Sequence, residues 1–381
     1  MMQMTVYPLL FSPCAIGKKI APNRFVAQPM ECNDSLGGKV SNRTIARYEA
    51  LAAGGWGVII IEALAIASDC LARKNQMILN KDNLGGFTQL VAAIRKINPE
   101  AIILMQIAHS GRKSGRDFSR PTALYAPKEG EHLLTDEEVE SIRTGFVEAV
   151  LLAEQAGADG VDFKLCHGYL GCEMLRPGNN REDQWGGSFE NRVRFLTKSI
   201  LEVRERLHSP EFILGSRISY YEGIRGGCGT SGADELTEDL REMDALIDVM
   251  KGLGMDYINV SAGIPGVTSE ITRPTGTSKW FYLHQFRYAQ RVKALAGSMK
   301  VFGSAYSVLQ EESLVLAEEN LRKGYVDFAG WGRQTLADPG FPNKIVDHNA
   351  VDYCIMCSGC SRLMVKQQPV ECIVYRKKHE E

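Results

Sequence analysis

Residues 135–166 read TDEEVESIRTGFVEAVLLAEQAGADGVDFKLC and join a segment of helical period to a short apolar run. The first part, 135–157, carries apolar residues at helical spacing and ends at Gly157, as helix C-termini prefer. The second part, 160–166, has the length and composition of a buried strand. The stretch therefore predicts one helix-to-strand unit of an α/β fold.

The same alternation recurs along most of the chain, with further helical patterns at 41–54, 188–207 and 307–324. No G-x-G-x-x-G fingerprint follows the first predicted strand, which argues against an open doubly wound sheet. We therefore expect an α/β fold of the (β/α)8 TIM-barrel type. Its eight strands are predicted at 25–30, 57–63, 101–108, 160–166, 212–219, 256–262, 300–305 and 326–333.

Three features lie outside the repeating unit. Residues 11–24 predict a hairpin around Gly17 that could close the bottom of the barrel. Long loops are expected at 220–236 and 263–283, on the face where barrels keep their specificity. We expect the barrel to span 1–345 and a cysteine-rich segment to span 346–381.

Composition narrows the class of partner. The formal charge of -2 and the pI near 6.4 lack the basic footprint of a nucleic-acid binder. The N-terminal residues have no basic n-region, and the most apolar stretch contains Glu62 and is too short to span a bilayer. We expect a cytoplasmic protein with a small-molecule substrate and without nucleic-acid or membrane partners, and a homo-oligomer is compatible with the sequence.

Polar residues at the predicted strand ends indicate a ligand. Barrels commonly bind phosphate between the loops after strands seven and eight, where Gly303-Ser304 and Gly332-Arg333 fall. The alternative is that these glycines only make tight turns. Arg217 needs an anionic or electron-rich partner, which could instead be Glu62. Gln106 could merely bond a neighbouring carbonyl, but beside Arg217 and a phosphate it could contact the carbonyl and imide edge of a flavin.

Longer motifs resemble a known family. The stretch HGYLGCEMLRPGNNREDQWGGSFENRVRF, residues 167–195, resembles the old yellow enzyme family of FMN-dependent ene-reductases. NRFVAQPM, MQIAHSGRKS and GWGRQTLADPGF match further family motifs in the same order. The resemblance implies an FMN-dependent NAD(P)H oxidoreductase. It implies FMN contacts from Pro29, Met30, Ala63, Gln106, Arg217, Gly303, Ser304, Gly332 and Arg333.

The resemblance also implies that His167 holds the activating oxygen of a substrate and that Tyr169 supplies a proton. Lys164 departs from the family pattern, where histidine is common, so the substrate clamp is altered. The chemistry needs donors on a carbonyl oxygen and an acid for the α-carbon, which Lys164, His167 and Tyr169 can provide. The alternatives are a solvated loop lysine, a structural histidine and a packing tyrosine.

Four of the ten cysteines lie near the C-terminus as Cys354-x2-Cys357-x2-Cys360-x11-Cys372. Four thiolates suit a [4Fe-4S] cluster or tetrahedral zinc, and the tight triple favours the cluster over zinc or free thiols. The spacing is similar to that of trimethylamine dehydrogenase, dienoyl-CoA reductase and 2-enoate reductase relatives. Electrons could enter from NADH or NADPH directly, or from a separate electron-donor protein.

We therefore expect reduction of the C=C bond of an activated alkene, an enone or an enoate. One alternative is an oxidative demethylase or amine dehydrogenase on the same barrel, which Lys164 disfavours because it would repel a cationic substrate. The other alternative is a non-catalytic flavin and iron-sulfur electron carrier.

Overall fold

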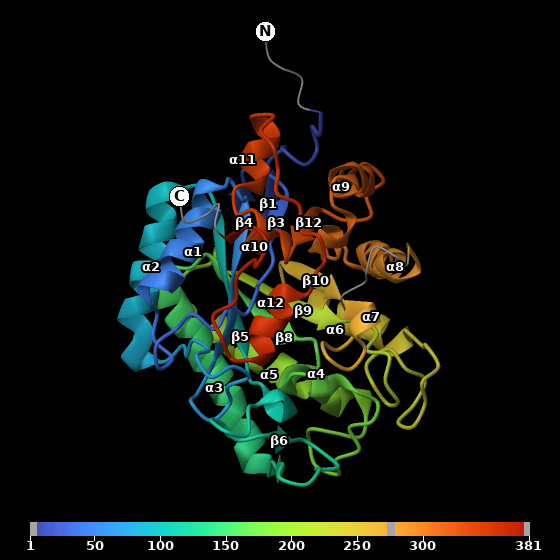
Figure 1. The fold of residues 1–381 in the computed structure, drawn as a ribbon. Coiled ribbons are helices and arrows are strands. Elements are labelled where there is room, and N and C mark those ends of the chain that lie inside the picture. The colour runs from blue at the N-terminus through green and yellow to red at the C-terminus, as the bar shows by residue number, and fades with distance from the viewer. Residues whose placement is uncertain (1–5, 273–278, 377–381) are drawn as a thin grey trace.

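A closed barrel of parallel strands forms the centre of the protein in a computed structural model that describes residues 6–272 and 279–376 (Figure 1). The strands follow one another around the barrel in chain order, and the last one pairs with the first. The predicted (β/α)8 barrel is confirmed, and all eight predicted strands coincide with barrel strands. These are β3 (Phe25–Ala27), β4 (Val58–Ala65), β5 (Ile102–Ala108), β8 (Gly160–Leu165), β9 (Ile213–Ser219), β10 (Tyr257–Ser261), β11 (Lys300–Gly303) and β12 (Phe328–Trp331).

Helices surround the barrel, and three of the long ones begin at polar caps. Ser41 and Thr135 form capping boxes with Thr44 and Glu138, and Ser188 caps the helix that follows it. The long helices are α1 (Asn42–Ala53), α2 (Leu84–Ile97), α3 (Asp136–Gln155), α5 (Phe189–Arg206), α6 (Arg241–Gly252), α8 (Lys279–Leu295) and α9 (Glu312–Arg322). The short ones are α4 (Leu170–Leu175), α7 (Ser269–Thr272), α10 (Gln334–Ala337), α11 (Phe341–Val346) and α12 (Gly359–Val365).

The N-terminal hairpin closes one end of the barrel, as the sequence predicts. It consists of β1 (Cys14–Ile16) and β2 (Lys19–Ala21), and Ile16 and Ala21 pack among inward-facing residues such as Val58 and Phe302. Gly17 turns the hairpin with φ 56°, and a Cβ there would lie 2.7 Å from Asp256 Oδ1. Because apolar side chains fill this end of the barrel, a ligand site is expected at the opposite end, where the carboxyl ends of the strands lie.

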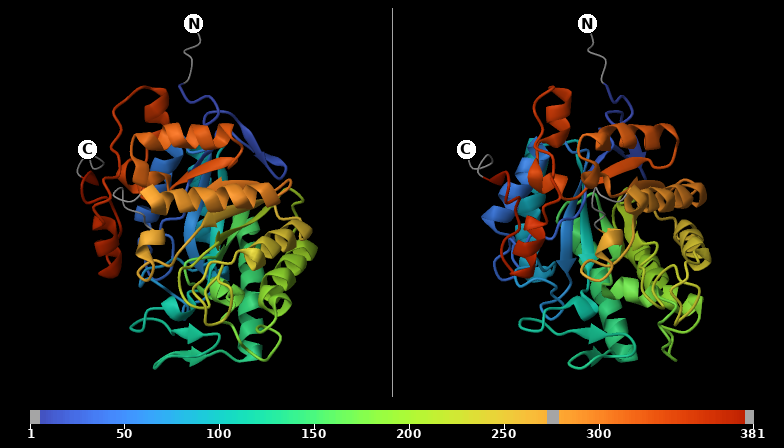
Figure 2. Two further views of the ribbon diagram at one scale, coloured as in Figure 1. Left: turned by 90° about the vertical axis from the view of Figure 1, so that its right-hand side faces the viewer. Right: turned by 45° about the vertical axis from the view of Figure 1, so that its right-hand side comes forward.

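The loops at that opposite end are long. Residues 220–240 connect β9 to α6, close to the predicted loop at 220–236. The predicted loop at 263–283 contains α7, and its residues 273–278 lie outside the described residues. A ribbon of β6 (Thr122–Ala123) and β7 (His132–Leu133), not expected from the sequence, lies at the end of the molecule away from the hairpin (Figures 1 and 2).

The C-terminal segment after α11 runs beside the first part of the chain (Figure 2). The backbone N–H of Val370 donates to the Cys32 carbonyl at 2.8 Å, and Arg47 Nη2 donates to the Val370 carbonyl at 2.6 Å. Cys32, Val370 and Leu336 share a small apolar cluster. The boundary between barrel and segment at residue 345 stays a prediction. In the parts of the chain that the structure describes, every helix is too short or too polar to cross a membrane.

We expect Asp159 to stabilise the hairpin end of the barrel. Its carboxylate accepts Lys19 Nζ at 2.6 Å, Arg95 Nη2 at 2.7 Å and the Ile103 N–H at 2.8 Å. Asp159→Asn should lower the free energy of unfolding by about 1.5 to 3 kcal/mol, because charge-assisted hydrogen bonds are lost. Urea unfolding measures the change. Asp248→Asn, in an exposed pair with Lys251, is the control and should alter it by less than about 0.5 kcal/mol. An equal effect of both substitutions would contradict this assignment.

Candidate functional site

A cavity of about 360 Å³ lies at the carboxyl ends of the barrel strands. In a TIM barrel this is the end that carries the active site. All three predicted catalytic residues and most of the predicted FMN contacts line it. These are Lys164, His167, Tyr169, Pro29, Met30, Gln106, Arg217, Ser304, Gly332 and Arg333.

Two predicted FMN contacts, Ala63 and Gly303, do not line this cavity. Ala63 packs in a buried cluster that includes Tyr169, and its carbonyl accepts Gln76 Nε2 at 2.8 Å. A Cβ on Gly303 would lie 2.9 Å from Val326 Cγ1, so the position has room only for glycine. Both residues lie directly behind the wall of the cavity, and their roles in binding stay predictions.

A layer of buried polar side chains forms the floor of the cavity inside the barrel. Gln106 Nε2 donates to Asp162 Oδ1 at 2.9 Å, so its partner is a carboxyl group and not the neighbouring carbonyl considered above. Gln28 Nε2 donates to Asn259 Oδ1 at 3.0 Å. Burial raises the pKa of Asp162, although Gln106 and Arg217 partly oppose the shift. The barrel interior thus changes from apolar at the hairpin to polar at the cavity.

Arg217 enters this layer from β9 without a carboxylate partner. Its guanidinium donates to Gln28 Oε1 and lies 3.3 Å from Ser304 Oγ. No ion pair with Glu62 or any other carboxylate forms among the described residues, and its buried Nε has no hydrogen-bond partner there. Burial lowers the pKa of Arg217. A buried cation with an unused donor fits an electron-rich or anionic ligand.

The loops after β11 and β12 form the second end of the cavity. Ser304 leads into Ala305, which has φ 73°, and Ser307 Oγ accepts the N–H groups of Gly332 at 3.1 Å and Gln334 at 3.3 Å. Arg333 makes no ion pair with a carboxylate in the described part of the chain. A serine hydroxyl and an arginine without a carboxylate partner are donors that can hold a phosphate. The donors present therefore fit a ligand that carries a phosphate group and an electron-rich ring, as FMN does.

The predicted catalytic residues converge at the mouth of the cavity. Lys164 lies within β8, and the chain then turns through His167 with φ 62° and Gly168 with φ 71° before Tyr169 caps α4. His167 Nε2 lies 2.8 Å from Ser261 Oγ, which fixes the ring. Lys164 Nζ lies 3.8 Å from the centre of the Tyr169 ring. The three side chains thus face one volume.

Glu31, a polar residue that follows the first predicted strand and to which the sequence assigned no role, joins this group. Glu31 Oε1 accepts Lys164 Nζ at 2.6 Å and the Tyr169 hydroxyl, and Glu31 Oε2 lies 3.4 Å from Arg73 Nε. Glu31 directly follows the first-strand motif, which could have indicated it. Arg73 lies in the loop after β4, far from any predicted strand end, and only the fold brings it to the cavity.

The C-terminal cysteines approach the phosphate end of the cavity. Cys360 lines it from α12, and Arg333 lies within electrostatic range of Cys354, Cys357 and Cys360. In the described parts of the chain, no three of the four quartet sulfurs lie within 4.8 Å of one another.

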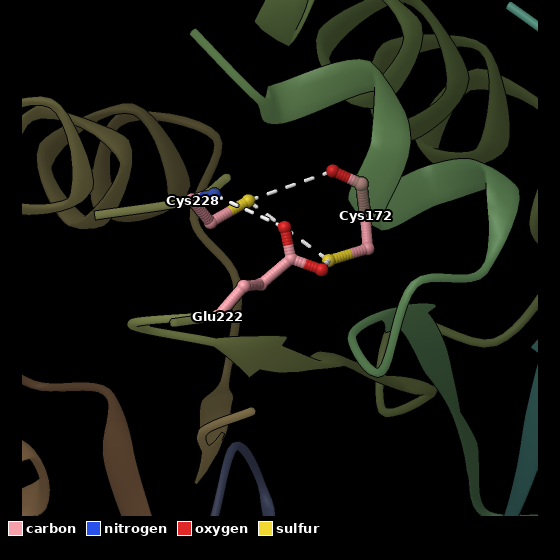
Figure 3. A group of neighbouring side chains, drawn as sticks. All are labelled: Cys172, Glu222 and Cys228. Carbon is pink, nitrogen blue, oxygen red and sulfur yellow. Dashed lines mark hydrogen bonds between the residues drawn. The ribbon is translucent and has the colours of Figure 1, made fainter. Parts of the chain in front are cut away.

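Cys172, Glu222 and Cys228 do form a close buried group, shown in Figure 3. The two sulfurs lie 3.9 Å apart, and Cys172 Sγ lies 3.1 Å from Glu222 Oε1. However, Arg176 binds both oxygens of Glu222 at 2.7 and 2.9 Å, and burial raises the pKa of the Cys172 thiol. A metal ion would have to displace the guanidinium, so the group is better explained as a hydrogen-bonded ion pair that joins α4 to the loop after β9.

The model of the NADH:flavin oxidoreductase / NADH oxidase family matches residues 9–351. The chain therefore belongs to this family of flavin-dependent oxidoreductases, as its resemblance to old yellow enzymes indicated.

Two relatives define the sequence similarity. A Thermoanaerobacter brockii NADH oxidase is 30% identical over 374 residues, which cover 94% of this chain and 54% of that protein. A Geobacillus NADPH dehydrogenase is 31% identical over 351 residues, which cover 88% of this chain and 92% of that protein. The chain thus spans about half the length of the NADH oxidase and nearly all of the NADPH dehydrogenase.

Solved structures share the fold. A 2-naphthoyl-CoA reductase has a TM-score of 0.83 at 22% identity, over 97% of this chain and 57% of that chain. An old yellow enzyme homologue from Zymomonas mobilis has a TM-score of 0.72 at 20% identity, over 90% of this chain and 93% of that chain. At these identities the likeness concerns the barrel and not the substrate.

We expect Arg333→Ala to weaken FMN binding roughly tenfold to a hundredfold, because a charge-assisted contact to phosphate is worth about 1.5 to 3 kcal/mol. Titration of the apoprotein with FMN, followed by flavin fluorescence, measures the dissociation constant. Arg322→Ala, an exposed change on α9, is the control and should leave the constant unchanged. An unchanged constant in Arg333→Ala would place the phosphate elsewhere.

Proposed function

We propose that this protein reduces the C=C bond of an activated alkene, an enone or an enoate, with FMN as cofactor and NADH or NADPH as electron donor. The observation that carries the proposal is the convergence of Lys164, His167 and Tyr169 on a cavity that is also lined by Arg217 and Arg333, neither of which pairs with a carboxylate among the described residues. Donors for an oxyanion, a proton source and donors that fit FMN thus line the same cavity.

Each side chain has a part in this reaction. Bound FMN would supply a hydride for the β-carbon. His167, oriented by Ser261, and Lys164 would donate hydrogen bonds to the carbonyl oxygen as negative charge develops on it. Tyr169 would give its proton to the α-carbon. Burial and the neighbouring Glu31 raise the pKa of Tyr169 well above its usual value, so the phenol is protonated at neutral pH.

Amine oxidation is the second candidate on the same barrel. An amine oxidase and a histamine dehydrogenase have this fold, at 23% and 22% identity. The charges around the cavity argue against a cationic substrate, since Arg73, Lys113 and Lys164 line it and Glu31 pairs with only two of them, Arg73 and Lys164. Burial, with Arg176 and Arg73 nearby, lowers the pKa of Lys113. This excess of cations favours an electron-rich carbonyl compound or a carboxylate.

The cysteine quartet would hold a [4Fe-4S] cluster beside the phosphate end of the cavity. Three of the four thiols, Cys354, Cys357 and Cys360, lie within electrostatic range of Arg333, and their tight spacing in the sequence favours the cluster over zinc. At that place the cluster could receive electrons from a separate donor protein. A non-catalytic carrier would not need Lys164, His167 and Tyr169 at the cavity mouth.

We expect Tyr169→Phe to slow reoxidation of the reduced flavin by a simple enone by roughly 10² to 10⁴, the usual contribution of a general acid. FMN binding and reduction of the flavin should be preserved, because only a hydroxyl is removed. Anaerobic stopped-flow absorbance measures both half-reactions. A nitroalkene, whose anionic intermediate can take a proton from water, is the matched substrate and should lose less. Reoxidation by the enone at the parent rate would make Tyr169 a packing residue.

Anaerobically purified protein should contain close to four irons per chain, as measured by metal analysis, because Cys354, Cys357, Cys360 and Cys372 supply four thiolates. Cys357→Ser should lower the iron content. Cys14→Ser, a change in the hairpin, is the control and should not. One zinc per chain, without iron after anaerobic reconstitution, would refute the cluster.

A further inference from the structure

Glu31 binds three functional groups at the cavity with one carboxylate. It is 8% exposed and follows β3 directly after Pro29 and Met30. Oε1 accepts both the Lys164 ammonium at 2.6 Å and the Tyr169 hydroxyl, and Oε2 faces Arg73 at 3.4 Å. The Tyr169 hydroxyl is therefore hydrogen-bonded to the Glu31 carboxylate, which is itself hydrogen-bonded to the Lys164 ammonium. The three groups form a path along which a proton can move.

The contacts of Glu31 and Tyr169 determine the charge that each of them carries. Burial alone would raise the pKa of Glu31, but Lys164 and Arg73 lower it to about 2, so the carboxylate is ionised. Among the described residues, the titratable groups that face Tyr169 are Glu31, Arg73, Lys164 and Cys166. A phenolate at Tyr169 would lie against a carboxylate. Loss of the Tyr169 proton is therefore costly unless another proton replaces it.

We propose that Glu31 is a positioning residue that orients the Tyr169 hydroxyl and returns a proton to it from Lys164. This inference rests on the proposed alkene reduction and adds a proton path to it. As the Tyr169 O–H bond breaks, its proton forms the new C–H bond at the α-carbon. A proton from Lys164 Nζ passes to Glu31 Oε1 and from there to the Tyr169 oxygen. Lys164 is left as an amine and takes a proton from solvent.

The path leaves Tyr169 and Glu31 as they were. Before and after the transfer, Tyr169 is a neutral phenol and Glu31 a carboxylate, and the site has lost one positive charge at Lys164 until solvent returns a proton to it. Arg73, whose side chain is 24% exposed, is the most exposed member of this group. No oxidant or reductant is needed beyond the hydride of the proposed reaction.

A second buried carboxylate provides a matched control. Glu62 is 2% exposed, lies on the neighbouring strand β4, and accepts the Cys32 N–H at 2.8 Å. Burial raises its pKa to about 8, so at neutral pH it is a neutral acid that glutamine can mimic. Glu62→Gln therefore removes a buried carboxyl group without removing a charge from the site.

The first test needs no turnover. In protein labelled with ¹³Cζ-tyrosine, the Tyr169 resonance is identified by its absence from Tyr169→Phe. We expect it to titrate well above the usual range of tyrosine in the parent and in Glu62→Gln. In Glu31→Gln, which removes the repelling charge, its pKa should fall by roughly one to three pH units. Glu31→Asp keeps the charge and should keep the pKa high. An unchanged Tyr169 titration in Glu31→Gln would overturn the proposal.

The second test follows reoxidation of the reduced flavin by an enone in H2O and D2O. Glu31→Gln should slow it roughly tenfold to a hundredfold, less than loss of the acid itself, and should raise the solvent isotope effect because proton return limits the rate. Glu31→Asp keeps the charge on a shorter side chain, so its rate of reoxidation should lie between the rates of Glu31→Gln and of the parent protein. If Glu31→Gln has the same rate and the same solvent isotope effect as the parent protein, the proton path through Glu31 is refuted. If the parent protein reduces no alkene, the proposed function fails, whereas the Tyr169 titration still decides the contact with Glu31.

Discussion

The pairing of β12 with β3 closes the barrel and brings the segments that follow its first and last strands together at the site. Three residue pairs make this contact, between Phe25 and Ala329, Val26 and Gly330, and Ala27 and Trp331. Because the strands are parallel, the segment after β3, with Pro29, Met30 and Glu31, leaves the barrel beside Gly332 and Arg333. A Cβ on Gly332 would lie 3.1 Å from Met30 Sδ, which shows how closely the two segments approach.

The two ends of the barrel interior differ in their chemistry. Ile16, Val58 and Phe302 fill the hairpin end with apolar side chains. Gln28, Arg217 and Asn259 fill the other end with hydrogen-bonding groups that depend on one another. The cavity lies at this polar end, and the loops after β10, β11 and β12 contribute much of its lining.

The barrel and the residues at its strand ends were predictable from the sequence, because helical and strand periods alternate and the functional groups follow the strands. Arg73 and its contact with Glu31 were not, because Arg73 lies in a connecting loop whose path depends on tertiary packing. Ala63 illustrates a second limit. It was expected at a strand end, but β4 continues to Ala65 with a register shift between Ile61 and Leu64. Such an irregularity has no periodic signature.

The most direct measurement of the central claim is a single turnover under anaerobic conditions. The protein is reduced at its flavin and mixed with an enone or an enoate, and oxidised protein is mixed separately with trimethylamine. The account predicts reoxidation of the flavin together with one saturated product molecule per flavin, and no reaction with the amine. Flavin that stays reduced in the presence of both alkenes, or oxidised flavin that becomes reduced by the amine, would contradict it.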